Sequence, residues 1–142
     1  MRKREVGSRK KARWLALQAL YAWWVSHNEV PEIEKYFLAQ HADENFDQAY
    51  FHTLLFEVTQ KASELDNFMK PYLNIALDEL DYIEYNLLRL AVYELQYQPE
   101  VPYRVVINEA LELAKTFGAK DSYKFVNGAL DKMAKNIRPS ER

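Results

Sequence analysis

The chain has 142 residues, of which 49% are hydrophobic and 28% charged, with a net charge of -2, three glycines, five prolines and no cysteine. A chain of this length and composition can bury a core of its own, and we treat residues 1–142 as a single domain. The lack of cysteine in the sequence excludes a disulfide framework, thiol catalysis and cysteine-ligated zinc, and it is compatible with a reducing cytoplasm.

The net charge conceals an uneven distribution. Residues 1–13 hold seven of the 19 Lys and Arg and only one acid, so they carry +6, whereas the rest of the chain has 12 basic and 20 acidic side chains and carries -8. A basic segment on an acidic body commonly meets a polyanion, and a solvated terminus is the alternative interpretation. We predict a flexible basic arm over residues 1–8.

The stretch GSRKKARWLALQALYAWW, residues 7–24, joins this basic segment to an apolar one. Secretion signals, membrane-surface helices and nucleic-acid-binding helices all begin in this way. A signal needs a cleavage site of small residues, but here Gln18 interrupts the apolar run 14–25 and Ser-His-Asn-Glu follows it. A membrane-surface helix lines its polar face with cations, whereas these cations precede a helix with apolar residues on several sides. We favour a helix buried among others with a protruding basic start. No stretch approaches the ~20 apolar residues of a membrane span.

The next segments are predicted as helices whose ends are marked by proline. Pro31 suits the first turn of a short helix over residues 31–40. Apolar residues spaced by three and four predict a long helix over 47–69, ended by Pro71, and another over 75–97, closed by Pro99.

Two further helices complete the chain. One covers residues 105–117, with Gly118 placed as its C-cap, and the last begins at Asp121 or Ser122 and has its apolar side at residues 125–133. The tail, 138–142, is predicted to be frayed. Because no alternating strand pattern occurs anywhere in the sequence, the predicted fold class is all-α.

Catalytic motifs are missing from the sequence. The three histidines (His27, His41 and His52) sit in different elements without metal-ligand spacing, so we expect them at the surface or hydrogen-bonded. Asp78, Asp81 and Glu84 fall near one face of the predicted helix; a metal or acid–base site is one interpretation, and a solvated face or a partner-docking patch is the other. Neither GxxxxGK nor GxGxxG occurs. We therefore predict no enzyme, no metal and no cofactor.

Six blocks, in this order, resemble one protein family. They are SRKKAR, LQALYAW, MKPYL, LRLAVYEL, VPYRVVINEALELAKTFG and KFVNGALDKMAK, and they run from about residue 8 to residue 138. Together they resemble the NusB family of bacterial transcription antitermination factors, and the last two blocks are the most specific. The initial MRKREVG, with Arg2, Lys3 and Arg4, lies outside the match, and Lys120 is an additional cation beside Asp121.

The resemblance implies a fold and a function. The implied fold is about seven helices in two small packed bundles. The implied function is binding of boxA single-stranded RNA together with NusE, a small-subunit ribosomal protein, in a complex with other Nus factors and RNA polymerase that reads through terminators in ribosomal RNA operons. The implied location is the cytoplasm, without a membrane.

The matched positions include residues with the chemistry that single-stranded RNA requires, cations for phosphates and planar rings for bases. The candidate RNA-binding residues are Arg9, Lys10, Lys11, Arg13, Tyr72, Phe117, Asp121, Lys124 and Phe125. Four cations on phosphates predict a slope of roughly -3 for log affinity against log salt. Core packing is the alternative for the three rings, and Asn127 is expected to be a buried residue that caps or braces a helix.

The resemblance also points to a surface for the protein partner, with Tyr21, Asp78, Glu79 and Glu84 as candidates. An acidic patch would attract a basic ribosomal protein, and core packing is the alternative for Tyr21. Two other functions stay open. One is an RNA-targeting module like the NusB-like domain of some ribosomal RNA methyltransferases, which would require this chain to be a fragment of a protein with a catalytic domain. The other is a protein adaptor whose basic arm is incidental.

Overall fold

The computed structural model describes the backbone of residues 2–141 and the side chains of residues 9–141. Seven α-helices and three short 3-10 helices make up this part of the chain, and no strand occurs in it, which confirms the all-α prediction. The chain divides into two compact units, and the boundary between them along the sequence lies between Gln60 and Lys61. They correspond to the two bundles that the resemblance implies.

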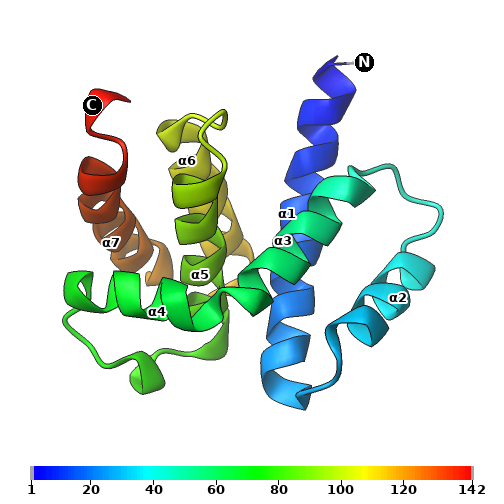
Figure 1. Ribbon diagram of the computed structural model, residues 1–142, viewed down its shortest axis with the longest axis horizontal. Coiled ribbons are helices and arrows are strands. Elements are labelled where there is room, and N and C mark those ends of the chain that lie inside the picture. The colour runs from blue at the N-terminus through cyan, green and yellow to red at the C-terminus, as the bar shows by residue number, and fades with distance from the viewer. Residues whose placement is uncertain (1, 142) are drawn as a thin grey trace. The chain divides into compact units, whose positions relative to one another are not determined.

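The first unit is a three-helix bundle (Figure 1). It contains α1 (Arg2–Ser26), α2 (Val30–Gln40) and α3 (Gln48–Gln60), and α1 packs against both of the others. Its fully buried side chains include Leu15, Leu17, Leu20, Phe51, Leu54, Leu55 and Val58. The three tryptophans of α1 are only half-buried, and leucines of this helix fill the core.

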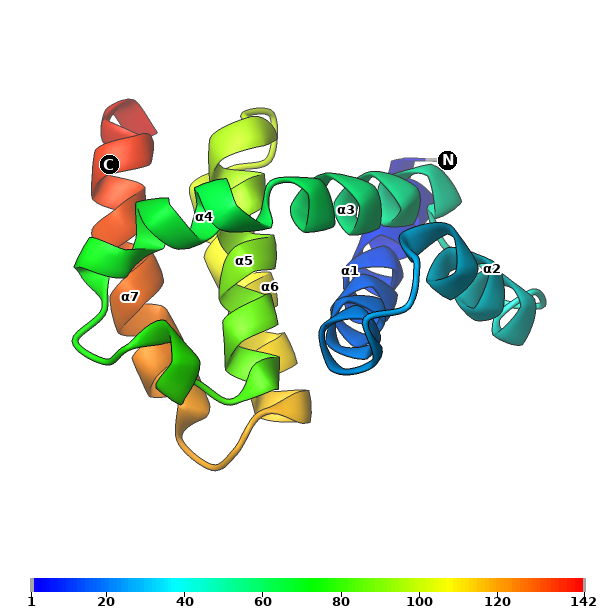
Figure 2. The ribbon, with the colours of Figure 1, turned by 60° about the horizontal axis from the view of Figure 1, so that its bottom comes forward.

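The second unit is built around α5 (Tyr82–Tyr97), which packs against α4 (Ala62–Met69), α6 (Tyr103–Phe117) and α7 (Ser122–Ile137). Figure 2 shows α5 between α4 and α6. Every residue of α5 from Tyr85 to Leu95 is buried, as expected for a helix enclosed on all sides. The 3-10 helices η1 (Lys70–Tyr72), η2 (Leu77–Glu79) and η3 (Pro139–Glu141) complete the unit.

The predicted helix over 47–69 is in fact two helices. It breaks at Lys61, whose backbone (φ -99°, ψ 13°) departs from helical values although neither glycine nor proline is nearby. Thr59 precedes the break, and its hydroxyl donates to the carbonyls of Leu55 and Phe56 at 2.8 and 3.1 Å. Such hydrogen bonds back to the preceding turn often bend helices. The break coincides with the boundary between the two units.

The predicted helix over 75–97 begins later than expected. Asp81 is its N-cap, and the Asp81 carboxylate accepts the backbone N–H of Glu84 at 2.8 Å. Aspartate is among the best N-cap residues, so the helix starts at Tyr82. Asp78 lies in η2, outside the helix, and the prediction that Asp78, Asp81 and Glu84 share a helical face was wrong.

The turn between α6 and α7 depends on one glycine. Gly118 is the C-cap of α6, as predicted, but its backbone is extended (φ -86°, ψ 171°) and not left-handed. A Cβ at this position would lie 2.7 Å from the Ala114 carbonyl oxygen, so the close approach requires glycine. Asp121 is the N-cap of α7 in the left-handed region (φ 68°), and its side chain makes no capping hydrogen bond.

The two chain ends differ from the prediction. Helix α1 begins at Arg2, where we predicted a flexible arm over 1–8; the side chains of Arg2, Lys3 and Arg4 lie outside the described residues. The frayed tail predicted over 138–142 does not hold for residues 138–141. They form η3 and a buried network centred on Arg138, which is only 7% exposed.

Candidate nucleic-acid interface

The first two candidate RNA-binding cations of α1, Arg9 and Lys10, lie at the surface of their unit. The Arg9 guanidinium lies 4.1 Å from the centre of the Tyr50 ring and 3.6 Å from the Asp47 carboxylate. Lys10 is exposed. Both side chains remain at the surface, where ion pairs contribute only about 0–1 kcal/mol and other anions can replace them.

The other two cations differ from each other. Lys11 forms an ion pair with Glu44 at 2.8 Å, and its ammonium lies 4.4 Å from the centre of the Trp14 ring. Arg13 is only 5% exposed, and its guanidinium lies 5.5 Å from the Tyr50 ring centre. A phosphate therefore has no open approach to Arg13 in this arrangement, although the sequence grouped it with its neighbours.

The acidic partners come from the loop between α2 and α3. Asp47 also caps α3, because its carboxylate accepts the backbone N–H of Tyr50 at 2.9 Å. Glu44 accepts hydrogen bonds from Lys11 and His41, and these bonds hold the pKa of Glu44 below its ordinary value. The loop thus places two carboxylates next to cations predicted to bind RNA.

The three candidate rings belong to the second unit, and all are half-buried. Tyr72 lies in η1, 5.4 Å from the Phe68 ring, and its hydroxyl accepts a hydrogen bond from Asn136 of α7. Phe117 is the last residue of α6, and Phe125 lies in the first turns of α7. Their partial exposure leaves both stacking on a base and packing in the core physically open.

Polar candidates surround the start of α7. Asp121 and Lys124 are exposed and lie 3.6 Å apart as an ion pair. Asn127 was predicted to be buried and is exposed instead, so that expectation was wrong. The reason is helical spacing: Val126, Ala129 and Leu130 occupy the buried side of α7, and Asn127 projects away from it.

The predicted partner surface is divided between the units. Tyr21 in the first unit is 40% exposed, so it is not a core residue. Asp78 and Glu79 are exposed in η2 of the second unit. Glu84 is half-buried, and its carboxylate accepts the Ser122 hydroxyl at 2.6 Å, which ties the start of α5 to the start of α7.

The histidines behave as expected. His41 is hydrogen-bonded to Glu44 at 2.7 Å, His52 is hydrogen-bonded to Glu34 at 2.6 Å, and His27 is exposed. Within residues 9–141, no group of three or more His, Asp or Glu side chains is arranged to hold a metal ion. None of the described helices is long and apolar enough to cross a membrane.

One buried polar network was not predicted from the sequence. Arg89, 1% exposed, donates through Nε and Nη2 to the two carboxylate oxygens of Asp66, each at 2.9 Å, and through Nη1 to Asn86 at 3.1 Å. The Tyr85 hydroxyl donates to the same carboxylate at 2.7 Å, and burial together with that carboxylate raises the pKa of Tyr85 to about 12. An arginine inside the apolar block LRLAVYEL was the available signal, but the sequence did not identify its partner.

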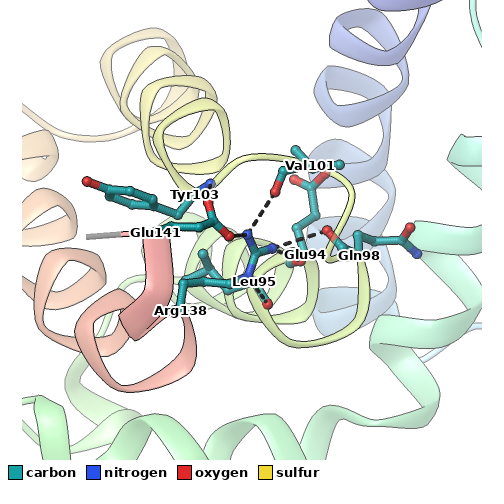
Figure 3. A network of polar contacts seen from close by, with 7 residues as sticks. All are labelled: Glu94, Leu95, Gln98, Val101, Tyr103, Arg138 and Glu141. Carbon is teal, nitrogen blue, oxygen red and sulfur yellow. Dashed lines mark hydrogen bonds and ion pairs between the residues drawn. The ribbon is translucent and has the colours of Figure 1, made fainter.

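A second network closes the corner between α5 and α6 (Figure 3). Arg138 donates to the carbonyls of Leu95 at 2.9 Å, Val101 at 3.0 Å, Gln98 at 3.1 Å and Glu94 at 3.3 Å. It also pairs with Glu141, whose other carboxylate oxygen accepts the Tyr103 N–H at 3.0 Å. A cation thus caps the carboxyl end of α5, and an anion caps the amino end of α6, in agreement with both helix dipoles.

Comparison with known proteins places these residues in a family. The model of the NusB family matches residues 10–135. The chain is 50% identical to the transcription antitermination protein NusB of Sodalis glossinidius (strain morsitans) over 135 residues, 95% of this chain and 97% of that protein. It is 49% identical to NusB of Baumannia cicadellinicola subsp. Homalodisca coagulata over 138 residues, 97% of this chain and 99% of that protein.

Solved structures agree. The NusB chain of a crystal structure of antitermination factors NusB and NusE in complex with dsRNA superposes with a TM-score of 0.83 at 29% identity, covering 91% of this chain and 97% of that one. A structure of T. maritima NusB gives a TM-score of 0.81 at 31% identity, covering 94% and 95%. Because the family model covers residues 10–135 and relatives of about 50% identity match almost the whole length, this chain belongs to the NusB family of transcription antitermination proteins.

Proposed function

We propose that this chain binds boxA-type single-stranded RNA together with a NusE-type ribosomal protein, and that the complex joins other Nus factors and RNA polymerase in the cytoplasm to suppress termination in ribosomal RNA operons. The observation that carries the proposal is the group of cations at the surface of α1, Arg9, Lys10 and Lys11, where Arg9 and Lys11 form surface ion pairs with Asp47 and Glu44. The likeness to a NusB that was solved with NusE and RNA supports it.

The contacts to phosphates come from Arg9, Lys10 and Lys11 in this proposal. Arg9 and Lys11 exchange the carboxylates of Asp47 and Glu44 for phosphate oxygens, which costs little because ion pairs at the surface are weak. Arg13 is buried near the Tyr50 ring of α3, so it holds α1 against α3 and does not touch RNA. Three phosphate contacts, not four, lower the expected slope of log affinity against log salt to roughly -2 from this segment.

The contacts to bases come from the second unit. Tyr72, Phe117 and Phe125 each have part of a ring at the surface on which a base can stack, and stacking contributes about 1–3 kcal/mol per base. Asp121 and Lys124 offer an acceptor and a donor to base edges beside Phe125. These contacts give the sequence preference that phosphate contacts alone cannot supply.

The protein partner meets the exposed Tyr21 and the acidic pair Asp78 and Glu79. A basic ribosomal protein is attracted to these carboxylates, mainly through a faster and better oriented encounter. Glu84 contributes less directly, because its carboxylate is engaged with Ser122.

Fluorescence anisotropy of a labelled boxA-type RNA tests the proposal, with a scrambled RNA as control, with and without the NusE-type protein. We expect tighter binding to the boxA-type RNA, strengthened by the partner protein. Lys10→Ala should weaken this binding, whereas Lys35→Ala, which removes an exposed cation of α2, serves as the matched control. Equal weak binding to both RNAs, unchanged by the partner protein, would favour an adaptor with an incidental basic segment.

A further inference from the structure

Gly128 has no structural explanation inside the described chain. It lies in the interior of α7 and is exposed, and a Cβ built on it would meet nothing within 4 Å. Gly118, by contrast, is required because a Cβ there would collide with the Ala114 carbonyl. Glycine is one of the poorest residues for a helix interior, since it loses the most conformational freedom and adds no packing. A close approach from outside the chain is the remaining reason for a missing side chain.

The neighbours of Gly128 on the helix surface are mainly basic. At 100° per residue, Gly128 lies at the centre of the outward face, opposite Val126, Leu130 and Met133. Lys124, Asp131 and Lys135 share its stripe at spacings of four, three and four residues, and Lys132 lies beside it. Asp131 lies 3.8 Å from Lys135, and Lys124 lies 3.6 Å from Asp121, so exposed carboxylates accompany two of the three lysines.

We propose that α7 carries a further RNA-binding surface centred on Gly128, where the ribose–phosphate backbone of a single strand lies directly against the helix. The rise of ~1.5 Å per residue puts the Cα atoms of Lys124 and Lys132 about 6 Å to either side, so both ammonium groups can reach a phosphate seated over the glycine. The exposed Asn127 amide is next to this seat and can hydrogen-bond a base edge or a 2′-hydroxyl.

Charge distinguishes RNA from a protein as the occupant of this surface. Helix α7 carries three lysines and one aspartate, whereas residues 61–142 as a whole hold 11 basic and 13 acidic side chains. A basic ribosomal protein would be repelled by this local excess, and a phosphate backbone would be attracted. The inference rests on the proposed function and extends it along α7, beyond Asp121, Lys124 and Phe125.

Two substitutions test this surface without threatening the fold. Gly128→Ala improves helix propensity in open space, so its melting temperature should rise by about 2–5 °C. If RNA lies against the glycine, affinity for the boxA-type RNA should nevertheless fall about fivefold, the size of one lost contact, and Gly128→Gln should lower it by more than about tenfold. Asn67→Ala, at an exposed position of α4, is the matched control that raises helix propensity elsewhere in the same unit.

The outcomes separate this inference from the proposed function. More stable Gly128 variants with weakened RNA binding, beside an unchanged Asn67→Ala protein, support it. Wild-type RNA affinity in both Gly128 variants overturns it while leaving the proposed function intact. Lost binding of the NusE-type protein with unchanged RNA affinity also overturns it, because the glycine would then serve a protein contact. If the wild-type chain itself shows no preference for the RNA, the proposed function fails first.

Discussion

Basic side chains occupy two contrasting environments in this molecule. On α1, Arg9 and Lys11 lie at the surface, each beside a carboxylate of the α2–α3 loop and an aromatic ring. In the second unit, Arg89 and Arg138 are buried, and each is surrounded by several acceptors at fixed distances. Surface pairs are exchangeable and suit a binding function, whereas buried, saturated guanidinium groups hold helices together. Substitutions should therefore separate binding from stability.

The largest expected effect is on stability, from Arg89→Ala. Removing one partner of a buried ion pair leaves the other charge without compensation and typically costs about 3–5 kcal/mol. Because the Asp66 side chain is 16% exposed and gains some hydration, we expect a loss of about 3 kcal/mol in the free energy of unfolding, measured by urea denaturation. Arg104→Ala, at an exposed position of α6, is the control. Equal losses of unfolding free energy in Arg89→Ala and Arg104→Ala would contradict the contrast between buried and surface cations.

Arg138→Ala should have the next largest effect. Its guanidinium supplies the donors for four carbonyls at the α5–α6 corner, and water can replace only part of them, so we expect a loss of about 2 kcal/mol. Hydrogen exchange should accelerate at the amides of residues 97–105, and Ser140→Ala in η3 should leave it unchanged. Unaltered hydrogen exchange at residues 97–105 would show that the Arg138 network does not stabilise the α5–α6 corner.

A smaller effect, on binding and not on stability, is expected from Glu44→Gln. The substitution removes the carboxylate that competes with phosphate for Lys11, so affinity for the boxA-type RNA should rise about two- to threefold. Glu32→Gln, at an exposed position of α2, corrects for the general change in net charge. Equal RNA affinity of the two variants would contradict the competition between Glu44 and phosphate for Lys11.

The smallest effect concerns the pH dependence of stability through Glu141. Hydrogen bonds from the Tyr103 amide and from Arg138 hold the pKa of Glu141 below its ordinary value of 4.5. The unfolded state therefore binds the proton more tightly, and the stabilisation is complete above that value and is lost as the pH falls through the lowered folded pKa. Glu141→Gln should be less stable than wild type at neutral pH, and the difference should shrink in acid. A difference in unfolding free energy that is independent of pH would exclude this linkage.

The sequence predicted the elements that depend on local pattern. Apolar spacing identified each helical region, and proline identified the helix start near Val30 and the helix ends near Met69 and Tyr97. The break at Lys61 was not predictable in this way, because its backbone turns without glycine or proline. Asp81 was a detectable N-cap, but the apolar pattern continued through it and hid the start of α5.

The sequence predicted which types of residue form the candidate site, but it predicted less well which of their side chains are exposed. Arg13 was grouped with the basic segment, yet its spacing of four and seven from Leu17 and Leu20 already placed it on the buried stripe of α1. The partners of Arg89 and Arg138 lie 23 and 37–44 residues away along the chain, apart from Asn86 and Glu141, which are three residues away. Such contacts arise only from tertiary packing.

One measurement tests the contrast between the surface cations of α1 and the buried arginines most directly. It is the salt dependence of boxA-type RNA binding, compared between the wild type and the Arg9→Ala, Lys10→Ala, Lys11→Ala triple variant. The free energy of unfolding of both proteins is measured in parallel. If these three cations bind phosphates, the slope of log affinity against log salt becomes less steep by about 2 in the variant. The unfolding free energy should change by less than about 1 kcal/mol, because the lost ion pairs lie at the surface. An unchanged slope would contradict the assignment of the α1 cations to RNA.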